Sequence, residues 1–105
     1  MAILSRETVL AGLHAAARIR SGEPPTKAEI AAAPKMEAWS LEPVEGGLYR
    51  LVGMVTGHPV IPPGFCRTSA LLVMSEDRTW ARTVSRVYAL GPALHDFLNE
   101  MRPQR

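Results

Sequence analysis

The chain has 105 residues, of which 47% are hydrophobic and 21% charged, and its formal net charge at pH 7 is +2. This composition predicts one folded domain with a single core and excludes a disordered tail. The charge is unevenly placed, because residues 48–91 hold five arginines against two acids. That excess is smaller than the one a uniformly basic nucleic-acid binder carries.

Cysteine content and hydropathy bear on the cellular compartment. Cys66 is the only cysteine, which excludes an internal disulfide and a multi-cysteine zinc site. No apolar run approaches the roughly 20 residues of a membrane-spanning helix. The opening MAILSRETVL lacks the basic start and the longer apolar run of a signal peptide. We therefore expect a cytoplasmic protein with no membrane attachment.

Two helices are expected at the start of the chain. Ser5 is a suitable N-cap for a helix over residues 6–20, and Gly22 with the two prolines after it ends that helix. Thr26 and Glu29 have the spacing of a capping box, which predicts a second, shorter helix. The apolar face of the first helix is expected to comprise Val9, Leu10, Leu13, Ala16 and Ala17.

Residues 48–91 hold most of the β-branched and aromatic residues and predict a sheet. Three proline residues within 57–64 predict a loop there. A weaker strand at 36–44 would be confined to an edge by Pro43, and whether it joins the sheet stays open. The three antiparallel strands that we expect cover residues 48–57, 65–75 and 79–90.

The C-terminal segment predicts one more helix. Pro92 suits its first turn, and an apolar stripe recurs at helical spacing, so we expect the stripe to pack on the sheet. The stripe comprises Leu94, Phe97, Leu98 and Met101. The expected fold is one α+β domain over 1–105: helices in 1–35, a three- to four-stranded antiparallel sheet in 36–91 and a helix in 92–102. A small SH3-like barrel with helical flanks is the alternative.

The segment 79–90 carries the main candidate binding residues. If it is one continuous strand, alternation puts four notable side chains on one face: Trp80, Arg82, Arg86 and Tyr88. A turn of two or four residues around Glu76-Asp77 would also set Arg67 opposite Arg86. Two opposed arginines favour an anion or carboxylate between them. A three-residue turn would remove this pairing, and neither turn contains the residues that decide between them.

Arginines beside aromatic side chains hold phosphates, stack on bases or anchor protein interfaces. The simpler interpretation is structural, with the aromatics ending the core and the arginines lying over them. For function we expect a non-enzymatic module that binds a protein partner, for example as a regulator or inhibitor of a larger complex. Its expected contact residues are Arg67, Trp80, Arg82, Arg86 and Tyr88. Nucleic-acid binding through the same face is the alternative.

A third hypothesis is a small enzyme in which His58 acts with a strand hydroxyl, although a histidine that only supports its loop explains the residue more simply. His14 and His95 lie on separate predicted helices, so no metal site is expected. Cys66 is expected to be a small buried hydrophobe. No pattern in the sequence requires a cofactor.

Gly57-His58-Pro59, Thr68-Ser69 and the run ARTVSRVYALG at 81–91 resemble a family of small bacterial proteins, common in alphaproteobacteria, that is known only as a domain of unknown function. The Pro25-Thr26 helix start, Ala33-Pro34 and Trp39 resemble it too. The resemblance covers about residues 20–91, and the helix at 94–101 is longer than in the family. It implies a soluble bacterial protein and carries over no catalytic residue.

Overall fold

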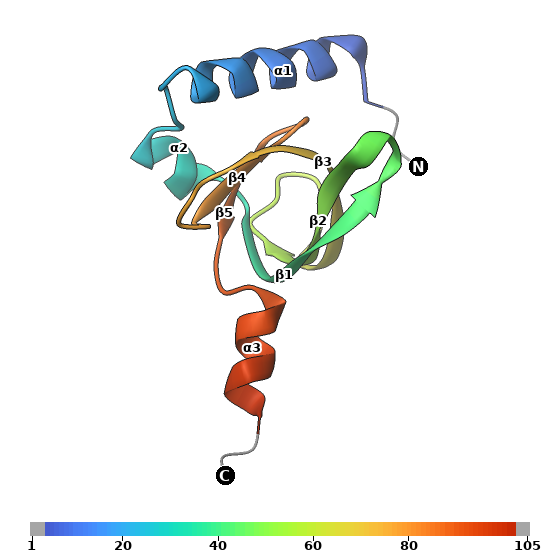
Figure 1. Ribbon diagram of the computed structural model, residues 1–105, viewed down its shortest axis with the longest axis vertical. Helices are drawn as coiled ribbons and strands as arrows, with labels where there is room; N and C mark the ends of the chain where they lie inside the picture. Colours follow the sequence, from blue (N-terminus) through green and yellow to red (C-terminus); the bar gives the residue numbers. More distant parts are fainter. Residues whose placement is uncertain (1–3, 103–105) are drawn as a thin grey trace.

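The computed structural model describes residues 4–102, which form a five-stranded β barrel with two helices before it and one after it (Figure 1). The helices are α1 (Arg6–Arg20), α2 (Lys27–Ala32) and α3 (Leu94–Met101). The strands are β1 (Lys35–Val44), β2 (Leu48–Thr56), β3 (Gly64–Met74), β4 (Trp80–Thr83) and β5 (Val87–Leu90); a 3-10 turn, η1 (Glu45–Gly47), joins β1 to β2. None of these helices has the length and apolar character needed to cross a membrane.

The starts of α1 and α2 are fixed by side chains close in sequence. The Ser5 hydroxyl accepts the N–H of Thr8 at 3.1 Å. At α2, the Thr26 hydroxyl accepts the N–H of Glu29 at 3.1 Å, and the Glu29 carboxylate accepts the N–H of Thr26 at 2.9 Å. These bonds satisfy backbone donors that a helix start leaves free. Both helices therefore lie in the ranges that the sequence predicts.

The face that α1 turns to the barrel differs from the predicted one. Gly12 and Ala16 are buried, whereas Leu10 and Leu13 are about half exposed. The reason is a close backbone approach: a Cβ atom on Gly12 would lie 2.2 Å from the carbonyl oxygen of Val84. Small residues thus let α1 contact the turn between β4 and β5, and the leucines predicted to face inward lie on the other side of the helix.

The sheet closes on itself. The strands follow the order β1-β2-β3-β4-β5, and β1 pairs in parallel with β5 through Lys35↔Ala89 and Met36↔Leu90. The expected open sheet is therefore wrong, and the SH3-like barrel with helical flanks fits. Segment 36–44 is a full strand that pairs with two neighbours, although Pro43 lies where β1 pairs with β2 alone. Closure leaves few unpaired strand edges.

The expected strand at 79–90 is two strands joined by a tight turn. The N–H of Thr83 donates to the carbonyl oxygen of Arg86 at 2.9 Å, and β4 and β5 then pair antiparallel, with Trp80 opposite Ala89. The turn contains no glycine, proline or asparagine, and Ser85 is its one residue of a type common in turns, so the local signal for it is weak. As a result, alternation does not continue from Arg82 to Tyr88, and the two residues face opposite sides of the barrel wall.

A bulge in β1 brings two large side chains into the core. Ala38 has φ 50°, and the register shifts between Glu37 and Ser40, so both Met36 and Trp39 point inward although they are three residues apart. Gly53 lies opposite the bulge, where a Cβ atom would come within 2.9 Å of the Trp39 Cα. The Trp39 Nε1 donates to the carbonyl oxygen of Gly91 at 2.8 Å, and the Ala38 N–H donates to that of Pro92 at 2.8 Å.

The barrel interior is mostly apolar, and its buried threonines are hydrogen-bonded. The Thr68 hydroxyl accepts the N–H of Leu51 at 3.0 Å and donates to the carbonyl oxygen of Ser69 at 2.7 Å. The Thr83 hydroxyl donates to the carbonyl oxygen of Arg86 at 3.1 Å. Such pairing offsets the loss of water around buried hydroxyls. The apolar core comprises Met36, Trp39, Leu51, Val55, Cys66, Ala81, Tyr88 and Leu90.

The last helix does not pack its stripe on the sheet. Figure 1 shows α3 extending away from the barrel beyond β5. Leu98 is 56% exposed and Met101 78% exposed, so the expectation that the stripe covers the sheet is wrong. The contacts that anchor α3 come from the residues before it, where the bulge of β1 meets the carbonyl oxygens of Gly91 and Pro92.

Candidate functional site

The five predicted contact residues lie in three separate places and share no common face. Arg67 lies on the outer face of β3 beside β2, and it pairs with Val52. Trp80 and Arg82 lie on the outer face of β4, because Ala81 and Thr83, which alternate with them, point into the core. Arg86 and Tyr88 turn toward the barrel interior. The five residues therefore do not form one contact surface.

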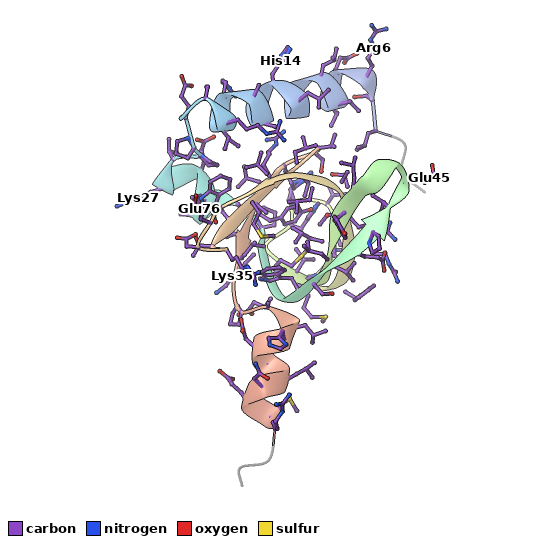
Figure 2. All side chains as sticks on the ribbon, in the orientation of Figure 1. Arg6, His14, Lys27, Lys35, Glu45 and Glu76 are labelled. Atoms are coloured by element: carbon purple, nitrogen blue, oxygen red, sulfur yellow. The ribbon has the colours of Figure 1, made fainter. Side chains whose placement is uncertain are left out.

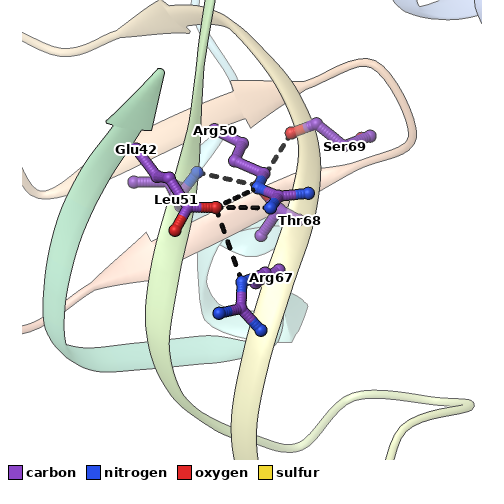
Figure 3. Close-up of polar contacts among 6 residues, drawn as sticks. All are labelled: Glu42, Arg50, Leu51, Arg67, Thr68 and Ser69. Carbon is purple, nitrogen blue, oxygen red and sulfur yellow. Dashed lines mark hydrogen bonds and ion pairs between the residues drawn. The ribbon is translucent and has the colours of Figure 1, made fainter. Parts of the chain in front are cut away.

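Arg67 takes part in an ion-pair network on the outer face of β1, β2 and β3. Figure 3 shows Glu42 between Arg50 and Arg67. The Arg50 Nε donates to a Glu42 oxygen at 2.7 Å and its Nη2 donates to the same oxygen, while the Arg67 Nε lies 3.5 Å from it. The hydrogen bonds from Arg50, with the charge of Arg67, lower the pKa of Glu42. The Arg67 guanidinium also stacks 4.9 Å from the Phe65 ring centroid.

The predicted opposition of Arg67 and Arg86 is wrong. The N–H of Ser75 donates to the carbonyl oxygen of Trp80 at 3.0 Å, which leaves four residues, 76–79, in the turn between β3 and β4. This turn lies one residue further along the chain than the four-residue turn that would set Arg67 opposite Arg86, so Val73 pairs with Arg82. Arg67 lies in the part of β3 that pairs with β2, far along the strand from this turn.

Arg82 lines a cavity of about 310 Å³ between the two N-terminal helices and the barrel. We call this space the helix–barrel cleft. Its walls come from the end of α1, the proline-containing link to α2, the start of α2, and strands β4 and β5. Four charged side chains line it, two of each sign: Arg18, Arg82, Glu23 and Glu29. The remaining lining includes Ala15, Ile19, Pro24, Pro25 and Val87.

The Arg82 guanidinium is only partly neutralised. Its Nη2 donates to the carbonyl oxygen of Val84 at 3.3 Å, but its Nε is buried and has no hydrogen-bond partner within residues 4–102. Burial, together with the positive charges of Arg18 and Arg86, lowers the pKa of Arg82, and the charge of Glu29 opposes this. The described residues provide no carboxylate in ion-pair contact with it. The cleft therefore contains a partly buried guanidinium whose Nε–H has no partner among residues 4–102, and the nearby charge of Glu29 forms no ion pair with it.

Arg86 and Tyr88 belong to a different place, which we call the barrel mouth: His58, Cys66, Arg86 and Tyr88. Tyr88 is 2% exposed, and burial raises its pKa to about 12. Its ring centroid lies 6.2 Å from that of His58, which comes from the loop between β2 and β3. Tyr88 therefore does not share the face of Trp80 as unbroken alternation would require, because the β4–β5 turn reverses the chain between them. Its burial fits the structural interpretation of the aromatic residues.

His58 supports its own loop. Its Nδ1 accepts the N–H groups of Val60 and Ile61, each at 3.0 Å. Burial and the charge of Arg86 lower the pKa of His58, so the ring is neutral at pH 7. The lone pair that a general base would use is already engaged, which favours the loop-supporting interpretation. Figure 2 shows His14 on the side of α1 turned away from the barrel, and residues 4–102 contain no cluster of metal-binding side chains.

Cys66 is a buried thiol. It is 4% exposed, and burial raises its pKa although the charge of Arg86 acts in the opposite direction. A thiol of this kind is a poor nucleophile, because the thiolate is the reactive form. The prediction that Cys66 is a small buried hydrophobe is confirmed by its place in the core.

Sequence reasoning missed Arg18 and Glu29 as neighbours of Arg82. Arg18 lies in the last turn of α1, where a basic residue complements the helix dipole, and Glu29 completes the capping box of α2, so each has a local explanation. Pro24 and Pro25 mark where the chain turns so that α2 comes to lie beside β5. Nothing local to Arg82 signals this, since the cleft joins residues more than fifty positions apart.

Comparison with known proteins assigns the chain to a family. A family model described as "Family of unknown function (DUF6634)" matches residues 4–103. The chain belongs to this family. The DUF6634 match extends the resemblance seen at residues 20–91 to include α1 and α3. No curated protein and no solved structure matches the chain. The role of this DUF6634 protein must therefore be argued from its own site.

Proposed function

We propose that this DUF6634 protein is a non-enzymatic interaction module that binds a protein partner at the helix–barrel cleft. Arg82 and Arg18 receive an acidic side chain of the partner, and the partner is a larger complex that the module regulates or inhibits. We place its work in the bacterial cytoplasm, where reducing conditions suit a chain whose one cysteine is a buried free thiol.

The observation that carries this proposal is the state of Arg82. Its Nε is buried without a hydrogen-bond partner in the described chain, and Arg18 adds a like charge across the same cavity. Leaving a buried donor unpaired costs about 1–3 kcal/mol, more when the group is charged. A carboxylate that enters the cleft would remove this cost and relieve the repulsion between the two arginines. Binding energy is thus available to an acidic partner.

The charges of the cleft favour a protein over a nucleic acid. Glu23 and Glu29 line the same cavity as the two arginines, so a single carboxylate fits better than a chain of phosphates, which would meet both acids. Of the two aromatic residues predicted to stack on bases, Tyr88 is unsuited to this because it is buried in the barrel. The cleft therefore supports recognition of one acidic group in a protein surface.

The proposal is tested by capturing partners from the source cells with the full-length protein as bait. We expect the specific partners to be depleted about tenfold or more from an Arg82→Gln bait, because a charge-assisted hydrogen bond of 1.5–3 kcal/mol is lost. Arg67→Gln is the matched control, since Arg67 is neutralised by Glu42. Equal recovery with wild-type and Arg82→Gln baits would contradict the proposal.

A salt titration separates the nucleic-acid alternative. We expect no measurable binding of mixed-sequence duplex DNA or single-stranded RNA by the purified protein at low salt. Affinity that falls steeply with salt, and that is reduced by Arg82→Gln, would instead favour phosphate recognition. Binding should be followed by fluorescence anisotropy over a range of salt concentrations.

A further inference from the structure

The barrel mouth brings together polar side chains from three segments that are distant in sequence. His58 comes from the loop between β2 and β3, Cys66 from β3, and Arg86 with Tyr88 from the β4–β5 hairpin. The rings of His58 and Tyr88 are 6.2 Å apart. The loop is fixed over this end of the barrel because Ile61 packs against the core. The cluster therefore lies between strands of the barrel and a loop that contacts with the core hold in place.

Arg86 is the least satisfied member of the cluster. Its Nε is buried and has no hydrogen-bond partner in the part of the chain that the structure describes. No described acid forms an ion pair with it. Its charge acts on the cationic Arg82 and on the neutral ring of His58, and neither group offers it a negative charge. Buried donors in folded proteins are nearly always paired, so the Arg86 Nε–H is a donor for which a bound acceptor would be favourable.

The other polar groups of the barrel mouth also present donors. Because the His58 Nδ1 accepts two backbone N–H groups, the ring proton is on Nε2, which is left as a donor. The hydroxyl of Tyr88 stays protonated at neutral pH, since burial raises its pKa to about 12. The Arg86 charge acts on both His58 and Tyr88, whose rings are neighbours. A guanidinium, an imidazole N–H and a phenol O–H are groups that bind a small oxyanion.

We propose that the barrel mouth is a binding site for a carboxylate or phosphate group, held by the Arg86 guanidinium with the His58 Nε2–H and the Tyr88 hydroxyl as further donors. This site is separate from the helix–barrel cleft, and its existence does not depend on the proposed function. The loop that carries His58 forms one wall, so an anion bound here would also hold that loop on the barrel.

The test is a titration of the full-length, isotope-labelled protein with sodium acetate and with inorganic phosphate, at constant ionic strength set by sodium chloride. We expect saturable shifts of the Arg86 Nε–H and His58 Nε2–H resonances with one of the two anions. Saturation by acetate assigns a carboxylate ligand, and saturation by phosphate assigns a phosphate group. No saturable shift with either anion would overturn the proposal.

Two variants from different segments sharpen this test. Arg86→Gln should weaken the binding of the effective anion about tenfold or more, as expected for loss of a charged hydrogen bond. His58→Asn keeps an acceptor for the loop N–H groups but removes the Nε2 donor, and should weaken binding less. Arg102→Gln, remote at the end of α3, is the control. Saturable binding that persists unchanged in Arg86→Gln would overturn the proposal, whereas Arg82→Gln should retain it, which separates the two sites.

Discussion

Two pairs of arginines on the same barrel differ in what surrounds their charge. Arg50 and Arg67 lie on the outer face of β2 and β3 and share the carboxylate of Glu42. Arg82 and Arg86 lie on either side of the β4–β5 turn, and each has a buried Nε that lacks a partner among the described residues. The first pair is satisfied within the fold, and the second is not.

This difference shows that the residues near an arginine in space, and not those near it in sequence, determine whether its charge is neutralised within the fold. The sequence pattern grouped Arg67 with Arg82 and Arg86, yet Glu42 arrives from β1 and neutralises only the outer pair. A surface ion pair of this kind adds little stability, whereas an unpaired cation in a desolvated place is costly unless a ligand compensates it. The second pair is therefore where a partner has most to contribute.

The largest expected effect comes from displacing α1, which forms one wall of the helix–barrel cleft. Gly12→Ala would place a Cβ atom 2.2 Å from the Val84 carbonyl oxygen, so α1 must move off the β4–β5 turn. We expect the free energy of unfolding to fall by about 2 kcal/mol, as for other overpacked contacts. The Glu42 network should be unaffected. Urea denaturation measures the change.

His14→Ala, on the side of α1 away from the barrel, is the control for Gly12→Ala, and it should change stability by less than about 0.5 kcal/mol. If Gly12→Ala is as stable as the wild type, the close contact between α1 and the barrel does not exist in solution.

A second experiment compares the two arginine pairs by the sign of their effect on stability. Arg82→Met and Arg86→Met remove unpaired buried donors and keep an apolar side chain, so each should raise the free energy of unfolding by about 1 kcal/mol. Arg50→Met removes a satisfied partner of Glu42 and should lower it. Chemical denaturation at pH 7 decides. Changes of the same sign in all three variants would remove the distinction between the pairs.

A third experiment uses pH to examine the barrel mouth. The pKa of His58 is lowered in the folded state from its ordinary value of 6.5, so below that pH the unfolded chain binds a proton that the native ring does not. Stability should therefore fall as the pH drops below 6.5. Thermal unfolding from pH 7.5 to 5 measures this. His58→Asn should flatten the dependence; an unchanged slope would show that another group causes it.

The smallest effect is expected at Glu42. Glu42→Gln would remove the acceptor shared by Arg50 and Arg67, but the group is exposed to solvent and screened. The melting temperature should fall slightly at low salt, and the difference should disappear at high salt. A loss as large as that of Gly12→Ala would mean that the outer pair contributes more to stability than a screened surface ion pair does.

Local signals explain which parts of this fold the sequence could predict. Ser5, Thr26 and Glu29 contact residues only three positions away, so the starts of α1 and α2 follow from spacing alone. Barrel closure depends on Lys35 meeting Ala89, and the face of α1 depends on Gly12 meeting Val84. Contacts of this range leave no periodic trace in the sequence.

The candidate site was predicted in part for the same reason. Arg82 and Arg86 were identified from their residue type and their nearness to aromatic side chains. Their separation was not, because the Thr83–Arg86 turn is closed by the backbone and hydroxyl of Thr83 and has only Ser85 among the residue types that usually mark turns. Arg18 and Glu29, which line the cleft beside Arg82, belong to a helix pair whose position is set by packing.

The bulge in β1 has a consequence for what a one-residue deletion in this strand would do. Because Ala38 is the additional residue of the bulge, a chain without it would keep Met36 and Trp39 in alternate positions on the inner face. Such a shortened chain would retain its core but lose the N–H that the Pro92 carbonyl accepts. One position in the first strand thus supplies a bond that holds the segment before the C-terminal helix, while the inward alternation of Met36 and Trp39 does not require it.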